Sequence, residues 1–319
     1  MQPAIVTPGA ERTLTDVNEV GVIGSLQDSG AVLFRGFNAD AQTFADFSDR
    51  FSSAFTCDPH KVVANAWNGA PGVAGQVARR LSRTAKRVRA KRWPVHDASP
   101  ARFAPFTGYG LNPHNENSYL PGAFPELVWF HCSRPSAAGG STILVDGGEM
   151  LDRLDDSAAR FLRDEPIRYR TTLQTPQWQA TWGVDDQSAL RSLLDRQSGV
   201  SYELDEGGQL GLIFDSTQIF PRLFDGADVV RTNMLSLQPF DTVKSATAEC
   251  TPDGERVPEA VLSAVLDAAK ARTEVDLRAG DVIVIDNSRV LHGRMPFTDE
   301  SRRIETRCAW LRDDLRPTG

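Results

Sequence analysis

A run of four apolar residues near the carboxyl end, Val282 to Ile285, constrains the fold of this 319-residue chain more than any other feature. The run follows Gly280-Asp281 and ends at Asp286. It is too short for a buried helix, and a run of this length beside turn residues is typical of a central, buried strand. The chain therefore needs a sheet with covered faces.

Further short apolar runs predict more strands around this central one. The runs lie at residues 30–37, 127–132, 142–145 and 303–311, and helical signals lie at 14–29, 41–53 and 147–165. Many short strands with helices gathered near the amino end predict a mainly β fold with helical decoration, a β-sandwich or jelly roll. No internal repeat or low-complexity linker divides the chain, so we expect one domain over residues 1–319.

Composition and charge narrow the class of protein. No apolar run approaches the roughly 20 residues that cross a bilayer, and the amino end lacks the pattern of a secretory signal. A net charge of −7 argues against general affinity for nucleic acid. The four scattered cysteines, without a Cys-x-x-Cys spacing, are typical of reduced thiols. We therefore expect a cytoplasmic protein without a membrane partner.

The first chemical motif pairs His114 with Glu116, two residues later. Glycine and proline just before it argue against a helix, so the segment is extended. In an extended chain, residues i and i+2 point the same way, about 6.6 Å apart, and can converge on one metal ion. A chain with 5 histidines and 42 acidic residues contains such a pair by chance about as often as not, so the pair needs support elsewhere.

That support comes from His292, which follows the apolar run and precedes Gly293. A histidine close behind a core strand, with a glycine that allows close approach, suits a metal ligand that projects into a cavity. Two histidines and one carboxylate on one face of an Fe(II) ion leave three positions open, two for a keto acid and one for O₂. We therefore predict a non-haem iron site at His114, Glu116 and His292.

Two arginines further along imply two bound anions. Arg303 and Arg307 share one face of the predicted last strand, about 13 Å apart, and Arg302 lies on the other face. A guanidinium matches a carboxylate in shape, and a buried one without an anion is costly. We assign Arg303 to the distal carboxylate of 2-oxoglutarate and Arg307 to the primary substrate, with a structural ion pair as the alternative for each.

These residues give the chain a resemblance to the taurine dioxygenase and clavaminate synthase-like branch of the iron/2-oxoglutarate oxygenases. It looks most similar to the subgroup that contains the syringomycin-pathway aspartyl hydroxylase. The matching segments are residues 30–37, 114–119, 139–142 and 280–307. The resemblance extends over residues 30–311 and implies a double-stranded β-helix, a jelly roll, that uses Fe(II), 2-oxoglutarate and O₂. It also places Thr142 on the co-substrate carboxylate, where a simple turn residue is the alternative.

Two departures from the family pattern matter. At the carboxylate position taurine dioxygenase has aspartate. This chain has Glu116 there, and clavaminate synthase-like members also have glutamate. Because the related halogenases lack this carboxylate, its presence argues against halogenation. Residues 61–110 do not match the family well, and we expect them to form an irregular, basic, lid-like segment.

The resemblance also implies the reaction, which is oxidation, by default hydroxylation, of an unactivated C–H bond in a small molecule. We expect Arg307 and the loop residues Asn115, Ser118 and Tyr119 to position an amino acid or amino-acid-derived metabolite, free or carrier-bound, in natural-product biosynthesis. A sulfonate or other small anion is the second choice. The rivals from other classes are a non-catalytic jelly-roll binding protein and a cupin-type metal hydrolase or isomerase.

The stretch from Arg79 to Arg92 carries eight basic residues and no acidic one. Apolar residues recur through it at helical spacing, which predicts an amphipathic helix with a cationic face. Such a face would dock an acidic partner, such as a carrier protein that presents a tethered aminoacyl group, or a phosphorylated or acidic substrate. A solvated surface is the plain alternative, and nucleic acid is less favoured because the protein as a whole is acidic.

Overall fold

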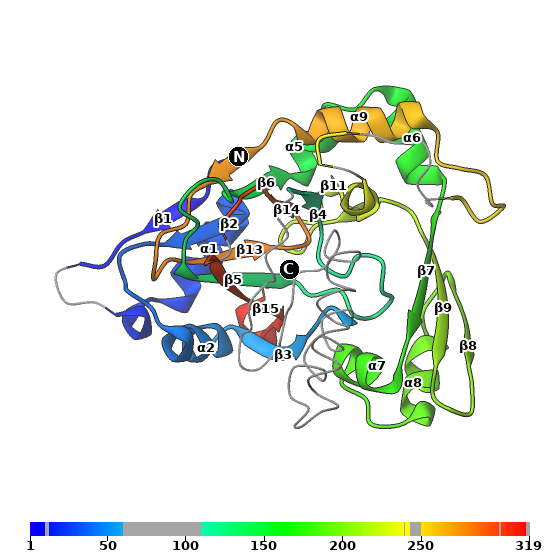
Figure 1. The fold of residues 1–319 in the computed structure, drawn as a ribbon, viewed down its shortest axis with the longest axis horizontal. Coiled ribbons are helices and arrows are strands. Elements are labelled where there is room, and N and C mark those ends of the chain that lie inside the picture. Colours follow the sequence, from blue (N-terminus) through cyan, green and yellow to red (C-terminus); the bar gives the residue numbers. More distant parts are fainter. Residues whose placement is uncertain (10–12, 60–109, 239, 243–249, 300, 317–319) are drawn as a thin grey trace.

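The computed structural model describes residues 1–9, 13–59, 110–238, 240–242, 250–299 and 301–316, and two facing sheets form its centre (Figure 1). The main sheet has six strands in the order β1-β2-β13-β5-β15-β3. Their bounds are Ala4–Val6 (β1), Ala31–Phe34 (β2), Val282–Asp286 (β13), Leu127–Arg134 (β5), Arg303–Leu311 (β15) and Ser52–Thr56 (β3). The first two strands pair in parallel, and the other neighbours pair antiparallel.

The second sheet has four strands in the order β12-β6-β14-β4. Their bounds are Thr273–Val275 (β12), Thr142–Asp146 (β6), Val290–Arg294 (β14) and Leu111–His114 (β4). A hydrophobic core joins side chains from both sheets, among them Val128, Phe130, Ile283, Leu144 and Val290. This pair of sheets is the jelly roll that the strand pattern predicts.

Strand β13 is the central strand that the apolar run predicts. Its residues Val282 to Ile285 are fully buried, and it pairs with β2 on one side and β5 on the other. The turn that leads into it requires glycine, because Gly280 has a φ of +80° and a Cβ there would lie 2.8 Å from the Cα of Asn38. The short buried run therefore fixes the middle of the main sheet.

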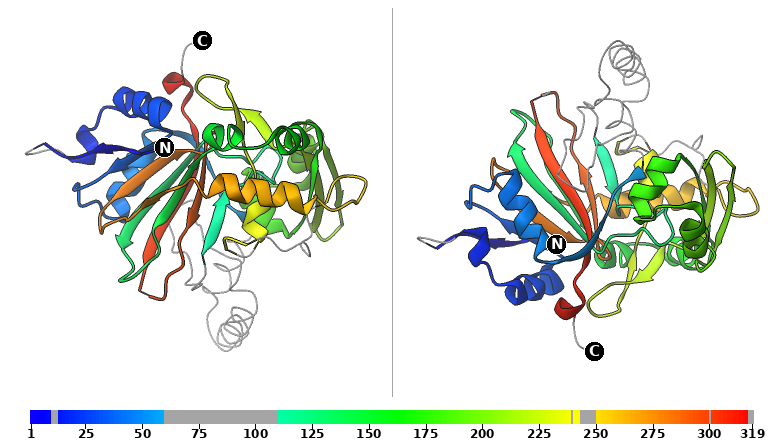
Figure 2. Two further views of the ribbon diagram at one scale, coloured as in Figure 1. Left: turned by 90° about the horizontal axis from the view of Figure 1, so that it is seen from above. Right: turned by 90° about the horizontal axis from the view of Figure 1, so that it is seen from below.

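Two helices cover the outer face of the main sheet, on the side away from the second sheet (Figure 2). Helix α1 (Glu19–Ser29) follows the short 3-10 turn η1 (Leu14–Asp16), and α2 (Ala41–Asp49) packs Phe44 and Phe47 against Trp129 of β5. Both helices lie within the ranges predicted for them. The second is shorter than its predicted range of 41–53, because β3 already begins at Ser52.

The described residues between 147 and 270 form an extension beside the two sheets (Figure 1). Its elements are α5 (Gly147–Leu151), α6 (Asp156–Asp164), β7 (Ile167–Leu173), α7 (Thr175–Trp182), α8 (Gln187–Leu194), β8 (Val200–Leu204), β9 (Leu210–Ser216), β10 (Ile219–Pro221), β11 (Asp228–Val230), η2 (Met234–Leu237) and α9 (Glu259–Ala269). Strands β7, β9 and β8 form a sheet of their own, packed on the buried Trp178 and Trp182. After β15 the chain ends in a 3-10 turn, η3 (Asp313–Leu315).

None of the described helices has both the length and the apolar character that crossing a bilayer requires. The expected basic helix from Arg79 to Arg92 lies outside the described residues, as does nearly all of the lid-like segment 61–110. Both stay predictions, and so does the assignment of residues 1–319 to one domain.

Candidate active site

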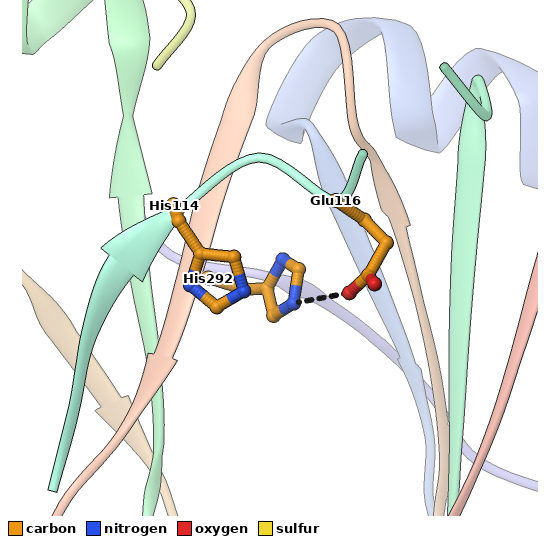
Figure 3. A group of neighbouring side chains, drawn as sticks. All are labelled: His114, Glu116 and His292. Carbon is orange, nitrogen blue, oxygen red and sulfur yellow. Dashed lines mark ion pairs between the residues drawn. The ribbon is translucent and has the colours of Figure 1, made fainter. Parts of the chain in front are cut away.

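Two neighbouring strands of the second sheet bring the predicted iron ligands together. His114 is the last residue of β4 and pairs directly with His292 of β14. Glu116 follows two residues after the end of β4, where the chain leaves the sheet. One ligand atom from each of the three side chains lies within 4.8 Å of the other two (Figure 3). The three residues therefore converge as the sequence predicts.

The close spacing of β4 and β14 depends on Gly293, the residue after His292. A Cβ at this position would lie 2.5 Å from the carbonyl oxygen of Leu111 on β4. Any side chain would push the two strands apart, so glycine sets the distance between the two histidines.

Each of the three side chains is buried, and neighbours fix its orientation. Their exposed fractions are 8% for His114, 4% for Glu116 and 5% for His292. Nδ1 of His114 donates to the carbonyl oxygen of Asn112 at 3.0 Å, which makes Nε2 the nitrogen that can bind a metal. Nε2 of His292 lies 3.5 Å from Oε2 of Glu116 (Figure 3), and the ring of Phe130 packs on this imidazole with 5.2 Å between centroids.

The chemistry of these donors fits a ferrous ion. Two imidazoles and one carboxylate on one side of a metal are typical of non-haem Fe(II) oxygenases and leave the opposite side open. Among the described residues, no second group of histidine, cysteine and acidic side chains meets at comparable distances. The triad is therefore the candidate metal centre of the described part of the chain.

Asn287, in the turn between β13 and β14, holds the backbone of the Glu116 loop. Its side chain accepts the N–H of Glu116 at 2.9 Å and donates to the carbonyl oxygen of the same residue at 3.1 Å. Sequence reasoning did not place Asn287 in the site, although its position directly behind the central strand was a usable signal. Its two bonds make it a positioning residue for a metal ligand.

Asn115 also positions this loop, and its expected substrate contact stays a prediction. The side chain is fully buried, donates to the carbonyl oxygen of Asn287 at 2.7 Å and accepts the N–H of Thr232 at 2.8 Å. The backbone N–H of Asn115 also donates to the carbonyl oxygen of Thr232 at 3.0 Å. Asn115 therefore ties the loop between two metal ligands to the segment after β11.

Asp286, at the end of β13, leads into the same turn, and only one of its two carboxylate oxygens accepts hydrogen bonds from described residues. Oδ1 accepts the N–H of Ser288 at 2.8 Å and its hydroxyl at 2.5 Å, while the buried Oδ2 has no partner among the described residues. Burial raises the pKa of Asp286 to about 6, although the bonds from Ser288 oppose the shift. The turn under the site thus contains an acid that ionises near neutral pH.

Thr142 begins β6, an inner strand of the second sheet, and Arg302 contacts Gly140, two residues before it. Thr142 is 6% exposed at the start of β6. Arg302 directly precedes β15 and donates to the carbonyl oxygen of Gly140 at 3.1 Å, beside a cavity of about 260 Å³ that it lines with Gly140 and Ile304. Burial lowers the pKa of Arg302 to about 10, and no carboxylate among the described residues pairs with it. Arg302 therefore can bind an anion.

Arg294 of β14 adds a second guanidinium beside Thr142, its register partner on β6. Arg294 and Arg302 both contact the ring of Phe297, at 4.8 and 5.1 Å from its centroid. The pKa of Arg294 is lowered to about 9 by burial and by the neighbouring charge of Arg302. Two crowded, desolvated cations make this end of β6 and β14 electropositive.

Arg303 and Arg307, the two arginines predicted to bind anions, lie on β15 and have partners within the protein. Arg303 begins β15, just before a register shift, and donates to the carbonyl oxygen of Arg302 at 2.9 Å. Arg307 is 4% exposed and pairs with Asp49 of α2 at 2.8 Å, with a further bond to Ser48 Oγ at 2.6 Å. Its register partner is Trp129, whose ring packs on α2. Arg307 thus has a counter-charge in the outer layer, and its expected contact with substrate stays a prediction.

His131 lies near Arg307 in this outer layer, on the neighbouring strand β5. It is fully buried, its Nδ1 bonds to the Glu305 carboxylate, and its Nε2 donates to the carbonyl oxygen of Ala39 at 2.8 Å. The ring stacks on Phe44 of α2 with 5.3 Å between centroids. His131 is thus a structural residue on the far side of the main sheet from Phe130 and His292.

Ser118 and Tyr119 continue the loop after Glu116, where the sequence places substrate contacts. The hydroxyl of Ser118 is buried and has no hydrogen-bond partner among the described residues. The Tyr119 hydroxyl donates to Asp58 at 3.3 Å. Burial, together with the charges of Asp58 and Glu116, raises the pKa of Tyr119 well above its usual range. Tyr119 therefore stays a neutral hydrogen-bond donor near the triad.

Comparison with known proteins finds a matching family model and two similar sequences. A family model described as "Taurine catabolism dioxygenase TauD, TfdA family" matches residues 6–310. A clavaminate synthase-like protein of Arabidopsis thaliana is 25% identical over 305 residues, which cover 89% of this chain and 82% of that protein. The dapdiamide synthesis protein DdaC of Enterobacter agglomerans is 22% identical over 206 residues, 59% of this chain and 62% of that protein.

The solved structure of PvcB from Pseudomonas aeruginosa has a similar fold, with a TM-score of 0.56, 15% identity, and coverage of 99% of this chain and 89% of that one. A second PvcB structure, described as an Fe, alpha-ketoglutarate dependent oxygenase from an isonitrile synthetic pathway, gives a TM-score of 0.53 at 17% identity, with the same coverage. These similarities confirm the predicted fold class.

Proposed function

The chain belongs to the TauD/TfdA family of dioxygenases, and from this premise we propose that it hydroxylates an unactivated C–H bond of an amino acid or amino-acid-derived metabolite. It is an enzyme whose cofactors are Fe(II) and 2-oxoglutarate, with O₂ as oxidant. The observation that carries the proposal is the convergence of His114, Glu116 and His292 on one point. The resemblance to the aspartyl hydroxylase subgroup, and a relative named for dapdiamide synthesis, support a role in natural-product biosynthesis.

His114, Glu116 and His292 would hold the iron. When bound, the ion couples substrate oxidation by O₂ to the decarboxylation of 2-oxoglutarate into succinate and CO₂. The contribution of the protein is placement, because Asn287 fixes the backbone of Glu116 and the Asn112 carbonyl fixes the imidazole of His114. Phe130 packs on His292 and excludes water from that side of the imidazole.

We assign the distal carboxylate of 2-oxoglutarate to Thr142 and Arg302. The family resemblance favours Arg303 for this role, whereas burial and the adjoining cavity favour Arg302. We give the geometry more weight, because a desolvated guanidinium without an internal carboxylate gains most from a bound anion. Arg294, opposite Thr142, would strengthen the local positive potential.

On the substrate side, Ser118 and Tyr119 are the residues we propose for direct contact. Their hydroxyl groups follow Glu116 in sequence by two and three residues, and the Ser118 hydroxyl is buried without a partner among the described residues. An acidic carrier protein docked at Arg79 to Arg92 stays a separate prediction about residues outside the described part.

Titration of the full-length protein with Fe(II), then with 2-oxoglutarate in the absence of O₂, tests the proposal. We expect one iron to bind per chain and a weak visible absorption band to form on addition of 2-oxoglutarate. His114→Ala should lose the iron and with it succinate production. Undiminished iron binding and turnover in both His114→Ala and His292→Ala would overturn the assignment. A panel of amino acids scored by succinate release then narrows the substrate.

A further inference from the structure

Arg231 follows β11 and is the least explained cation among the described residues. Its guanidinium carbon lies 3.5 Å from the ring centroid of Phe220 and 4.3 Å from that of Phe124. Aromatic faces on a guanidinium hold its plane still and leave its N–H edge available. The side chain is therefore arranged to donate hydrogen bonds in one plane.

No acceptor for this edge is found among the described residues. The Nε of Arg231 is buried without a hydrogen-bond partner, and no carboxylate forms an ion pair with the side chain. Burial lowers the pKa of Arg231 to about 10, which still leaves it charged at neutral pH. Arg231 as a whole is half-buried, but a largely desolvated cation without an internal anion is costly in free energy, and a bound anion would remove most of that cost.

Two connections place Arg231 beside the metal loop. Its neighbour Thr232 exchanges two hydrogen bonds with Asn115, the residue between two of the proposed iron ligands. A second connection leads through Tyr169, which interacts electrostatically with Arg231. The ring centroid of Tyr169 lies 6.4 Å from that of Tyr119, in the loop after Glu116. Arg231 thus belongs to the segment that adjoins the iron site, although it is far from Glu116 in sequence.

Other unsatisfied polar atoms lie on the same two segments. The Oδ1 of Asn233, two residues after Arg231, is buried without a partner among the described residues, as is the hydroxyl of Ser118. Both oxygens can accept a hydrogen bond, and Arg231 can only donate. The group defined by Ser118, Arg231 and Asn233 therefore matches a ligand that carries both a carboxylate and an ammonium group.

We propose that Arg231, held by Phe124 and Phe220, binds the free carboxylate of an amino-acid substrate next to the iron centre. Ser118 and Asn233 accept hydrogen bonds from the substrate ammonium group. A planar carboxylate meets the guanidinium edge with two parallel N–H···O bonds, which a tetrahedral sulfonate matches less well. This inference rests on the proposed function and adds the chemical group that the site recognises.

The proposal bears on whether the substrate is free or tethered to a carrier. A carrier thioester uses up the α-carboxylate and leaves a neutral carbonyl, which cannot balance a buried guanidinium. Recognition of the α-carboxylate by Arg231 therefore favours a free amino acid. A tethered substrate would satisfy Arg231 only through a carboxylate in its own side chain.

Calorimetric titration of the full-length protein, with and without bound Fe(II) and 2-oxoglutarate and always without O₂, tests the proposal. The probes are the protein amino acids, each beside its own α-carboxamide. We expect at least one free acid to bind about 10- to 100-fold more tightly than its amide, the range for a hydrogen bond between charged groups. Arg231→Met should remove this preference, and Arg231→Lys should keep part of it because the charge remains.

The matched control is Arg302→Met, which should weaken 2-oxoglutarate binding and leave the preference for acid over amide intact. Equal binding of acid and amide, no binding of any amino acid, or an unchanged preference in Arg231→Met would overturn the proposal. Iron binding is measured on the same samples. If the wild-type protein fails to bind iron, the proposed function is contradicted. The preference of the metal-free protein for acid over amide tests the role of Arg231 independently of that result.

Discussion

Arg302 and Arg307 lie five positions apart in sequence, yet their charges are balanced in different ways. In the outer layer, between the main sheet and α2, Arg307 pairs with Asp49, and His131 pairs with Glu305. Towards the second sheet, Arg302 has no carboxylate partner among the described residues. Because a buried charge must be neutralised, the outer layer contains its own counter-charges, whereas we expect Arg302 to take its counter-charge from a bound anion.

The strongest test of this comparison replaces one buried histidine in each layer, His292 near the triad and His131 in the outer layer. His292→Ala should abolish iron binding and turnover, because it removes one of three ligands, and should change the stability of the metal-free protein little. His131→Ala leaves the Glu305 carboxylate buried alone and should lower the unfolding free energy by about 3–5 kcal/mol. Iron content and urea unfolding of the two variants provide the measurement. Loss of iron in His131→Ala at unchanged stability would contradict the division into two layers.

The next largest effect is expected at the start of β15. Arg302→Met should weaken 2-oxoglutarate binding about 10- to 100-fold, since a charge-assisted hydrogen bond is lost. Arg303→Met, the matched neighbour, should change it little. Calorimetry with 2-oxoglutarate under anaerobic conditions distinguishes the two. The reverse order of effects would return the anchor to Arg303, where the family resemblance places it.

Arg307→Met tests the outer layer, where we expect an effect on stability and none on ligand affinity. It removes the bonds to Asp49 and Ser48 and should lower the unfolding free energy by about 1–3 kcal/mol. The affinities for Fe(II) and 2-oxoglutarate should stay the same. A selective loss of substrate affinity, with stability unchanged, would support the substrate role first assigned to Arg307.

The last expected effect concerns the two aspartates that flank the apolar run of β13, Asp281 and Asp286. Asp281 is contacted by Arg35 at 2.7 Å, whereas the pKa of Asp286 is raised by burial to about 6. Because this pKa lies above the unfolded value of about 3.9, the native state binds the proton more tightly. Ionisation of Asp286 therefore costs stability as pH rises from about 4 to about 6.

Asp286→Asn removes that cost. Relative to wild type, its unfolding free energy should improve by on the order of 2 kcal/mol between pH 4 and pH 7. Asp281→Asn should instead lower stability at pH 7, because it takes the carboxylate away from Arg35. Urea unfolding across this pH range checks both. Parallel curves for Asp286→Asn and wild type would show that Asp286 does not titrate as described.

The sequence predicts the centre of the fold and the metal ligands because both depend on local patterns. The run from Val282 to Ile285 is buried as predicted, and the extended segment at His114 delivers two ligands to one side. The surroundings of Arg302 and Arg307 could not be predicted, since they depend on a register shift at the start of β15 and on a partner in α2. Arg231 has no sequence motif at all, and only the fold places Phe124 and Phe220 on it.

The backbone contact at Gly293 has a consequence for how the iron site arises. With the Leu111 carbonyl occupying the space of a side chain, the two imidazoles are held at their spacing by paired strands before any ion arrives. The pairing of β4 with β14 therefore contributes to the geometry of the centre, in addition to any bound ion. A chain of this architecture with any other amino acid directly after the distal histidine would have to space these strands differently, which makes that glycine a useful marker when more distant members of the fold are sought.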